Sequence, residues 1–162
     1  GIIKAYSSCV GAGPFTCELF GKDGDELREA GGEYGAATGR PRRVGGFDVL
    51  ASRYGVLMQG ATCLAVTKLD VLSYLKKIPV CTGYVDKDGN AYDSFPLGVE
   101  LDEAKPVYEY FDGWNCDISS CRKFEELPEA AQKYVKYIEK EVGCPVQYVS
   151  VGAERDAYIK MF

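Results

Sequence analysis

The spacing of apolar residues alternates along the chain between a period of two and a period near 3.6, which predicts alternating strands and helices. We expect strands over residues 2–10, 62–67, 78–85, 91–95, 108–111 and 146–151. Helices are expected after Asp48 and after Pro128. This order is typical of an α/β fold with a mostly parallel sheet flanked by helices. The pair 78–85 and 91–95 adds an antiparallel hairpin excursion.

Both predicted helices carry start or stop signals. Asp48 is a good N-cap, and Leu50, Tyr54, Leu57 and Met58 then share one face. The second helix has a longer apolar stripe and ends at Gly143; the stripe consists of Ala131, Tyr134, Val135, Ile138 and Val142. The segment 31–46 holds six Gly and three Arg, so we expect a loop there rather than a regular element.

Composition narrows the function classes. The 162 residues are 46% hydrophobic, which suits one globular domain over residues 1–162. The net charge of −5 disfavours binding to nucleic acid, and no apolar run is long enough for a membrane span. The chain has no His, which excludes imidazole-based catalysis and zinc sites that need a His ligand. Because the chain begins at Gly1 and enters a predicted strand at once, we expect a piece of a longer protein.

The seven cysteines do not form a metal or disulfide pattern. Their number is odd and no CxxC pair occurs. We expect most of them to be small buried hydrophobic residues in a reducing cytoplasm, although Cys116 and Cys121 are close enough in sequence for a redox role.

The acidic stretch 86–90 (DKDGN) has some likeness to a calcium loop. An EF-hand needs its glycine at the sixth position, and Gly89 comes too early for that. The Asp88-Gly89 pair is instead typical of a hairpin turn.

The loop 35–43 (GAATGRPRR) contains three guanidinium groups within four residues. These groups repel one another, and a carboxylate or phosphate ligand would relieve the repulsion through paired hydrogen bonds. The Thr38 hydroxyl could add a further donor. The alternative is a solvated loop whose arginines pair with surface acids such as Glu33.

The sequence Thr67-Lys68-Leu69-Asp70 follows an apolar strand. A carboxylate there can accept two parallel hydrogen bonds from guanine, whereas adenine presents an acceptor at the same edge. Ser150, Val151 and Gly152 lie at the end of another predicted strand and could contribute backbone groups to the same base. Lys-x-Asp alone is common by chance, but the two loops strengthen each other.

Five runs resemble the C-terminal part of adenylosuccinate synthetases, in order and at that family's spacing: KAYSSCVGAGPFTCELF, GGEYGAATGRPRRVGGFD, TKLDVLSYL, IPVCTGY and YVSVGAERD. The resemblance covers essentially the whole chain and implies a P-loop NTPase-like fold. It also implies GTP-dependent ligation of aspartate to IMP through 6-phosphoryl-IMP, in a magnesium-dependent, cytoplasmic homodimer of purine synthesis.

The resemblance also assigns residues. The aspartate and IMP loop would consist of Ala36, Ala37, Thr38, Gly39, Arg40, Pro41 and Arg42. The GTP site would consist of Arg42, Lys68, Leu69, Asp70, Ser150, Val151 and Gly152. Arg40 would also reach the IMP ribose, and Arg42 would lie between aspartate and GTP. Ala37 replaces a Thr found in other family members, which puts one polar contact in doubt.

The family's phosphate loop, catalytic Asp and His, and magnesium ligands belong to its N-terminal part. We therefore expect no catalytic residue and no metal ligand in this fragment, and no ligase activity from it alone. Two alternatives stay open at this point. One is a regulatory guanine-nucleotide-binding module, and the other is a purely structural domain with solvated arginines.

Overall fold

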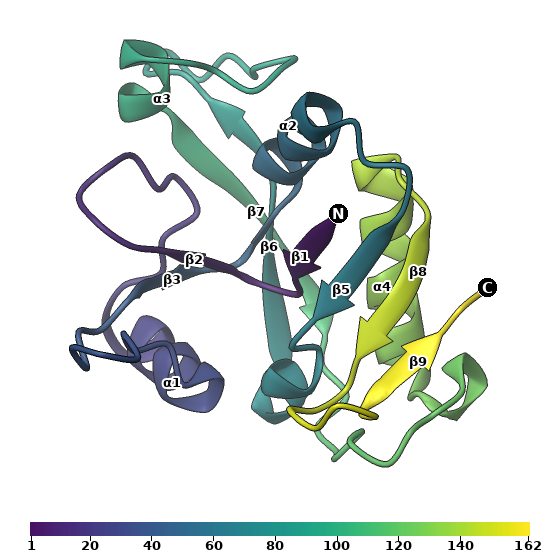
Figure 1. The fold of residues 1–162 in the computed structure, drawn as a ribbon. Coiled ribbons are helices and arrows are strands. Elements are labelled where there is room, and N and C mark those ends of the chain that lie inside the picture. Colours follow the sequence, from purple (N-terminus) through teal and green to yellow (C-terminus); the bar gives the residue numbers. More distant parts are fainter.

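The computed structural model describes all 162 residues and has no helix that could cross a membrane. Its main sheet has the order β1-β5-β8-β9 (Figure 1). The four strands are Ile2–Lys4, Leu64–Thr67, Val146–Ser150 and Tyr158–Lys160. The first three are parallel, and β9 is antiparallel at the edge. The mixed α/β class with a mostly parallel main sheet is therefore confirmed.

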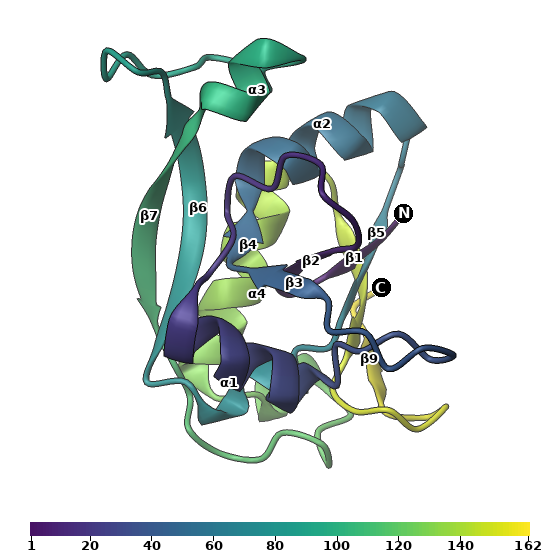
Figure 2. The ribbon, with the colours of Figure 1, turned by 90° about the vertical axis from the view of Figure 1, so that its left-hand side faces the viewer.

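Two smaller sheets accompany the main one. One has the order β4-β6-β7, with strands Phe47–Asp48, Lys77–Val85 and Lys105–Asp112. The other pairs β2, Ser7–Cys9, with β3, Arg43–Gly45. β6 and β7 form the long antiparallel excursion that rises away from the main sheet (Figure 2).

Helix α4, Glu129–Val142, lies behind β5 and β8 in Figure 1, and the turned view shows it between the main sheet and the β6–β7 pair (Figure 2). All five residues of its predicted apolar stripe are buried, and Gly143 ends it in the left-handed conformation. At its centre, Tyr134 packs against Phe111 and Trp114 and donates a hydrogen bond to the Ala5 carbonyl at 2.6 Å. The Tyr134 side chain thus connects α4 to β7 and to the chain just after β1.

Helix α2, Val49–Gln59, begins where the sequence predicts. The Asp48 carboxylate accepts a hydrogen bond from the Ala51 N–H at 3.0 Å, which satisfies a free donor of the first turn. Its predicted apolar face is only partly correct. Leu50 is buried, but Leu57 and Met58 are exposed because the second half of the helix projects beyond the sheets.

The remaining elements are short or were not expected. Helix α1, Gly21–Gly31, has no predicted counterpart. It packs closely because Gly24 has no side chain: a Cβ there would lie 2.4 Å from the Leu19 carbonyl oxygen. The others are η1, Asp70–Tyr74, α3, Val99–Glu103, and η2, Phe124–Glu126.

Three strand predictions need correction. The run 2–10 is two strands, because at Ala5 and Tyr6 the chain leaves the main sheet and then pairs with β3. The run 91–95 is not a strand: it makes a single bridge at Ala91, and β6 pairs with β7 instead. The turn at 86–90 is present. The run ending at residue 151 is not the last strand, since β9 follows it.

The cysteines are all free thiols. Four of the seven are buried, which confirms that most of them serve as small apolar residues; they are Cys17, Cys81, Cys121 and Cys144. Cys121 is buried and Cys116 is exposed, and the two form no disulfide in this structure.

Candidate functional site

The carboxyl ends of three neighbouring parallel strands meet at one edge of the main sheet. Lys4 of β1 is in register with Thr67 of β5, and Val66 of β5 is in register with Val149 of β8. The loop that follows β5 is joined to the end of β8 there, because the Leu69 N–H donates to the carbonyl of Ser150, the last residue of β8, at 3.2 Å. Ligands of open α/β sheets bind at such an edge. The structure therefore brings both halves of the predicted guanine site together.

Asp70 lies half-buried at this edge and makes no ion pair or hydrogen bond with another side chain. Burial raises the pKa of its carboxyl, while a hydrogen bond from its own backbone N–H and the nearby Lys68 charge act in the opposite direction. Both carboxylate oxygens keep lone pairs for an incoming ligand. Asp70 is thus free to accept a pair of hydrogen bonds.

A third loop at this edge was missed by sequence reasoning. Gly152 faces Ser119, since a Cβ at Gly152 would lie 4.0 Å from the Ser119 Cβ. Asp117 in the same loop is near enough to Asp70 to contribute to raising its pKa. No motif marks residues 117–119 in the sequence, and only the fold places them beside Gly152.

Lys68 has an unusual backbone and a well-held side chain. Its φ of 60° is in the left-handed region, which is uncommon for a residue with a side chain and tends to occur at functional sites. Its ammonium group donates to the Gly31 carbonyl at 2.6 Å and lies 3.3 Å from the Glu33 carboxylate. The side chain therefore crosses from the loop after β5 to the end of α1.

The glycine-rich loop folds back on itself. Gly35 donates to the Arg40 carbonyl and Gly39 donates to the Gly35 carbonyl, both at 2.8 Å, and Tyr34 bridges Pro41. Gly39 has a φ of 64°, which favours glycine. Arg40 lies exposed at the tip, and its guanidinium makes no ion pair or hydrogen bond within the chain.

The other two arginines each have an acidic partner. Arg42 lies 2.8 Å from Glu33, and Arg43 lies 2.6 Å from Glu18. Pairing with Glu33 was the alternative to ligand binding, but Glu33 is fully buried and not the surface acid that was expected. Only Arg40 of the three stays without a partner.

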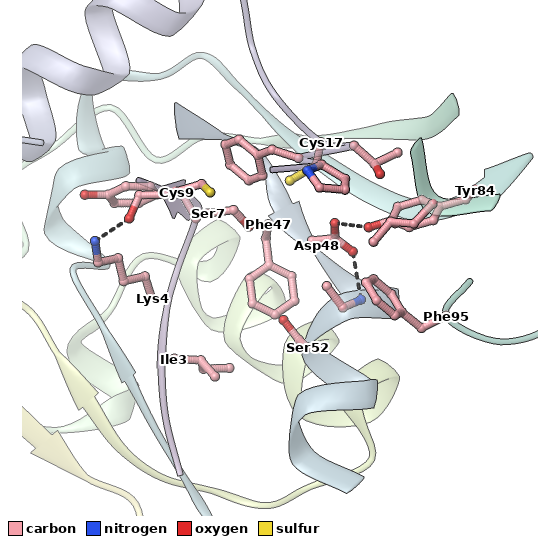
Figure 3. A pocket seen from close by; sticks show the side chains of 17 residues that line it. Ile3, Lys4, Ser7, Cys9, Cys17, Phe47, Asp48, Ser52, Tyr84 and Phe95 are labelled. Carbon is pink, nitrogen blue, oxygen red and sulfur yellow. Dashed lines mark hydrogen bonds between the residues drawn. The ribbon is translucent and has the colours of Figure 1, made fainter. Parts of the chain in front are cut away.

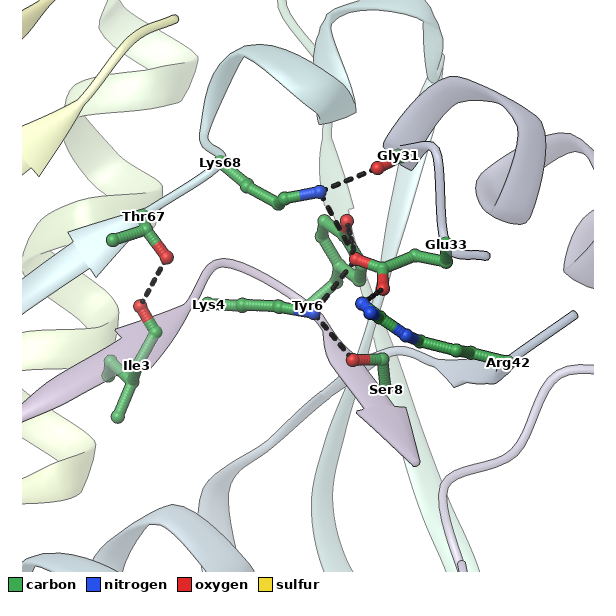
Figure 4. Close-up of polar contacts among 9 residues, drawn as sticks. All are labelled: Ile3, Lys4, Tyr6, Ser8, Gly31, Glu33, Arg42, Thr67 and Lys68. Carbon is green, nitrogen blue, oxygen red and sulfur yellow. Dashed lines mark hydrogen bonds and ion pairs between the residues drawn. The ribbon is translucent and has the colours of Figure 1, made fainter. Parts of the chain in front are cut away.

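Glu33 gathers donors from four places in the sequence (Figure 4). Its Oε1 accepts from Lys4 at 2.8 Å, from Tyr6 at 2.5 Å and from Lys68, and its Oε2 accepts from Arg42. Burial alone would raise the pKa of this carboxyl, but the hydrogen bonds from Lys4, Tyr6 and Arg42 outweigh it and lower the pKa to about 2. We call Glu33 with these four partners the Glu33 cluster.

A cavity of about 460 Å³ lies on the other side of Lys4 and Tyr6 (Figure 3). It is lined by β1 and β2, the segment 14–17, the start of α2, and Tyr84 and Phe95, and it contains none of the predicted site residues. Thr16 in its wall has a buried hydroxyl without a hydrogen-bond partner. The predicted site is therefore a loop-lined edge and not this cavity.

Acidic side chains and cysteines do not gather into a metal-binding cluster in this structure. No three acidic or Cys side chains lie close enough together to hold a metal ion. Asp70 and Asp117 are the acids near the loops after β5 and β8, and no third acid lies close enough to join them.

Residues 1–159 match the family model for adenylosuccinate synthetase. The chain belongs to this family. It is 54% identical over 160 residues to the adenylosuccinate synthetase of Pelobacter propionicus, covering 98% of this chain and 37% of that protein. It is 49% identical over 160 residues to the chloroplastic enzyme of Zea mays, covering 98% of this chain and 33% of that protein.

The fold agrees with this membership. The structure of a fully ligated adenylosuccinate synthetase from Plasmodium falciparum superimposes with a TM-score of 0.93 at 41% identity, covering 99% of this chain and 39% of that one. This confirms the expected P-loop NTPase-like α/β class. The chain spans about a third of the length of the family members that it matches.

Proposed function

We propose that the protein carrying this chain is an adenylosuccinate synthetase, which uses GTP to join aspartate to IMP through 6-phosphoryl-IMP. Residues 1–162 would be the C-terminal part of its single domain. The observation that carries the proposal is the edge where the loop after β5, with its unpartnered Asp70, is hydrogen-bonded to the last residue of β8. Family membership supplies the reaction that such an edge would serve.

In this proposal the sheet edge at the ends of β5 and β8 binds guanine. The Asp70 carboxylate would accept hydrogen bonds from the ring N1–H and the exocyclic amine of the base. The Lys68 stem would lie along the face of the base, while Leu69, Ser150, Val151 and Gly152 would enclose it. Adenine would bind poorly because it presents an acceptor where guanine presents a donor.

The glycine-rich loop would bind aspartate. The exposed Arg40 guanidinium can hold a carboxylate through two parallel hydrogen bonds, and it would also reach the IMP ribose. Thr38 would add its hydroxyl, and Arg42 would lie between aspartate and GTP. The backbone of Ala36, Ala37, Gly39 and Pro41 would shape the loop around the substrate.

The remaining chemistry is assigned to the rest of the protein. We propose that the phosphate loop, the catalytic groups and the magnesium ligands lie outside these residues, and that this chain alone has no ligase activity. A magnesium-dependent, cytoplasmic homodimer is proposed from the family resemblance. A regulatory guanine-binding module is the weaker alternative, because it would leave Arg40 without a ligand.

Steady-state kinetics on the full-length protein test the proposal. Arg40→Lys keeps the charge but loses the planar fork, so kcat/KM for aspartate is expected to fall about tenfold to hundredfold while the GTP parameters change little. Asp70→Asn is expected to reverse the pattern, with a loss of preference for GTP over ATP of roughly tenfold or more.

Arg43→Lys is the matched control, because Arg43 belongs to the same run of three arginines as Arg40 but is paired with Glu18. It is expected to leave all substrate parameters unchanged. If Arg40→Lys leaves the aspartate parameters unchanged, the loop is a solvated one. If the GTP to ATP ratio survives Asp70→Asn, Asp70 does not read guanine.

A further inference from the structure

The two oxygens of Glu33 face different loops. Oε2 accepts from Arg42, at the base of the glycine-rich loop, and Oε1 accepts from Lys68, in the loop after β5. The main chain of Glu33 is also fixed, since its N–H donates to the Arg28 carbonyl and its carbonyl accepts from the Arg42 N–H, both at 2.9 Å. One rigid residue therefore contacts both loops (Figure 4).

Glu33 has more positively charged neighbours than are needed to neutralise one buried carboxylate. Three cations surround a single carboxylate: Lys4, Arg42 and Lys68. Each of these side chains is about one-third exposed, at 29%, 33% and 37%. One cation is enough to neutralise a buried carboxylate, so the cluster holds a surplus of positive charge at the surface between the two loops. Such a surplus suits anionic ligands.

The two cations that face the ligand loops also keep free donors. Arg42 uses one N–H of its guanidinium on Glu33 and makes no other side-chain hydrogen bond within the chain. Lys68 uses its ammonium on the Gly31 carbonyl and on Glu33. Glu33 therefore fixes one end of the Arg42 guanidinium and leaves its remaining N–H groups open to a ligand.

We infer that Glu33 is a positioning residue that sets the aspartate loop and the guanine loop in one fixed arrangement through Arg42 and Lys68. The inference rests on the proposed function. It means that a residue assigned to neither substrate determines the affinity for both. Loss of its charge would release both cations together.

Glu33→Gln in the full-length protein is the test. The amide keeps the size but replaces one acceptor oxygen by a donor NH₂ group, which would face either Arg42 or the lysines. We expect KM for aspartate and KM for GTP each to rise about tenfold, since each ligand loses a positioned charged contact. The kcat at saturation is expected to stay within about threefold.

Glu18→Gln is the matched control. It removes the partner of the adjacent Arg43, in an ion pair at 2.6 Å that touches neither Arg42 nor Lys68. It is expected to leave both KM values unchanged. If both KM values also rise in Glu18→Gln, the effect is a general response to removing an acid near the loop, and the inference is overturned.

Tyr6→Phe keeps the inference testable if Glu33→Gln does not fold. It removes one neutral donor from Oε1 and leaves all three cations in place. We expect both KM values to rise together by about threefold in this variant. Glu33→Gln or Tyr6→Phe with only one KM changed, or with kcat lowered and both KM values unchanged, overturns the inference. A wild-type protein that forms no adenylosuccinate instead refutes the proposed function, and the inference with it.

Discussion

Glu33 and Asp48 are the two buried acids of the chain, and their surroundings are opposite. Three cations surround Glu33, and its pKa is lowered to about 2. No cation pairs with Asp48, which accepts hydrogen bonds from the Tyr84 hydroxyl at 2.5 Å and from the Ala51 N–H. Burial raises the pKa of Asp48 and outweighs these hydrogen bonds, which lower it (Figure 3).

The difference shows that burial alone does not tell what an acid does. Glu33, whose pKa is lowered, contacts Arg42 of the glycine-rich loop and Lys68 of the loop after β5. Asp48 caps a helix in an apolar surrounding that includes Cys17 and Cys81, and burial there raises the pKa of its carboxyl. The same substitution, carboxylate to amide, should therefore have different consequences at the two positions.

The largest expected effect is that of Glu33→Gln on stability. A pKa lowered from 4.5 to about 2 corresponds to roughly 3 kcal/mol of stabilisation of the folded state by the charged carboxyl. Because the folded pKa is the lower one, this contribution is complete above about pH 5 and is lost as the pH falls towards 2. Urea unfolding of the full-length protein at pH 7 and at low pH measures it.

At pH 7 the variant is expected to lose about 3 kcal/mol, and its deficit against the wild type should shrink as the pH falls below 4.5. Glu18→Gln, which breaks a more exposed pair, is expected to cost about 1 kcal/mol or less. Equal losses for the two variants would contradict the special position of Glu33.

Asp48→Ala comes next in size. It removes the cap of α2 and leaves the Tyr84 hydroxyl, which is buried, without its acceptor. Loss of a cap costs about 1 kcal/mol, and an unsatisfied buried donor adds about 1–3 kcal/mol. The expected loss of about 2–3 kcal/mol is measured by the same unfolding curves. Asp48→Ala with Tyr84→Phe should recover part of it, and no recovery would show that the hydroxyl finds another partner.

The smallest effect is expected from Asp48→Asn. Asparagine is an equally good N-cap, and its NH₂ group can donate to the Tyr84 oxygen, so the loss of an acceptor for the Tyr84 proton is offset by a new hydrogen bond to the same hydroxyl. At pH 7 the change in stability is expected to stay within about 1 kcal/mol. Because the pKa of Asp48 is raised in the folded state, the wild type loses stability as the pH rises from the ordinary pKa of an Asp through the pKa of the folded state. Asp48→Asn does not titrate and lacks this loss. A large deficit at neutral pH would show that the charge itself is needed.

The sequence was informative where local pattern and packing agree. The stripe of α4 was read correctly because a long amphipathic period has a single buried face. The strands that end at Thr67 and at Ser150 were predicted close to their observed positions, and their adjacency in the sheet brings the segments after them together. The roles of these loop residues stay a proposal.

The predictions that were wrong or absent have physical reasons. Helix α1 is polar and contains Gly24 within it, so its stability comes from tertiary packing around Leu27 and not from an apolar stripe. The run 91–95 follows a turn typical of a hairpin, but β7 supplies a longer partner for β6. Glu33 looked like a surface acid because its donors come from residues 4, 6, 42 and 68, and no local rule connects these positions.

The hydrogen bond between Leu69 and Ser150 also bears on the order of events during synthesis of the chain. β5 lies beside β8, from which it is separated by the whole β6–β7 excursion and by α4. The loop after β5 leaves the ribosome long before its partner does, and contacts of such separation form late. A nascent chain that has not yet reached residue 150 has the Lys68-Leu69-Asp70 sequence but lacks the Ser150 carbonyl that accepts the Leu69 hydrogen bond.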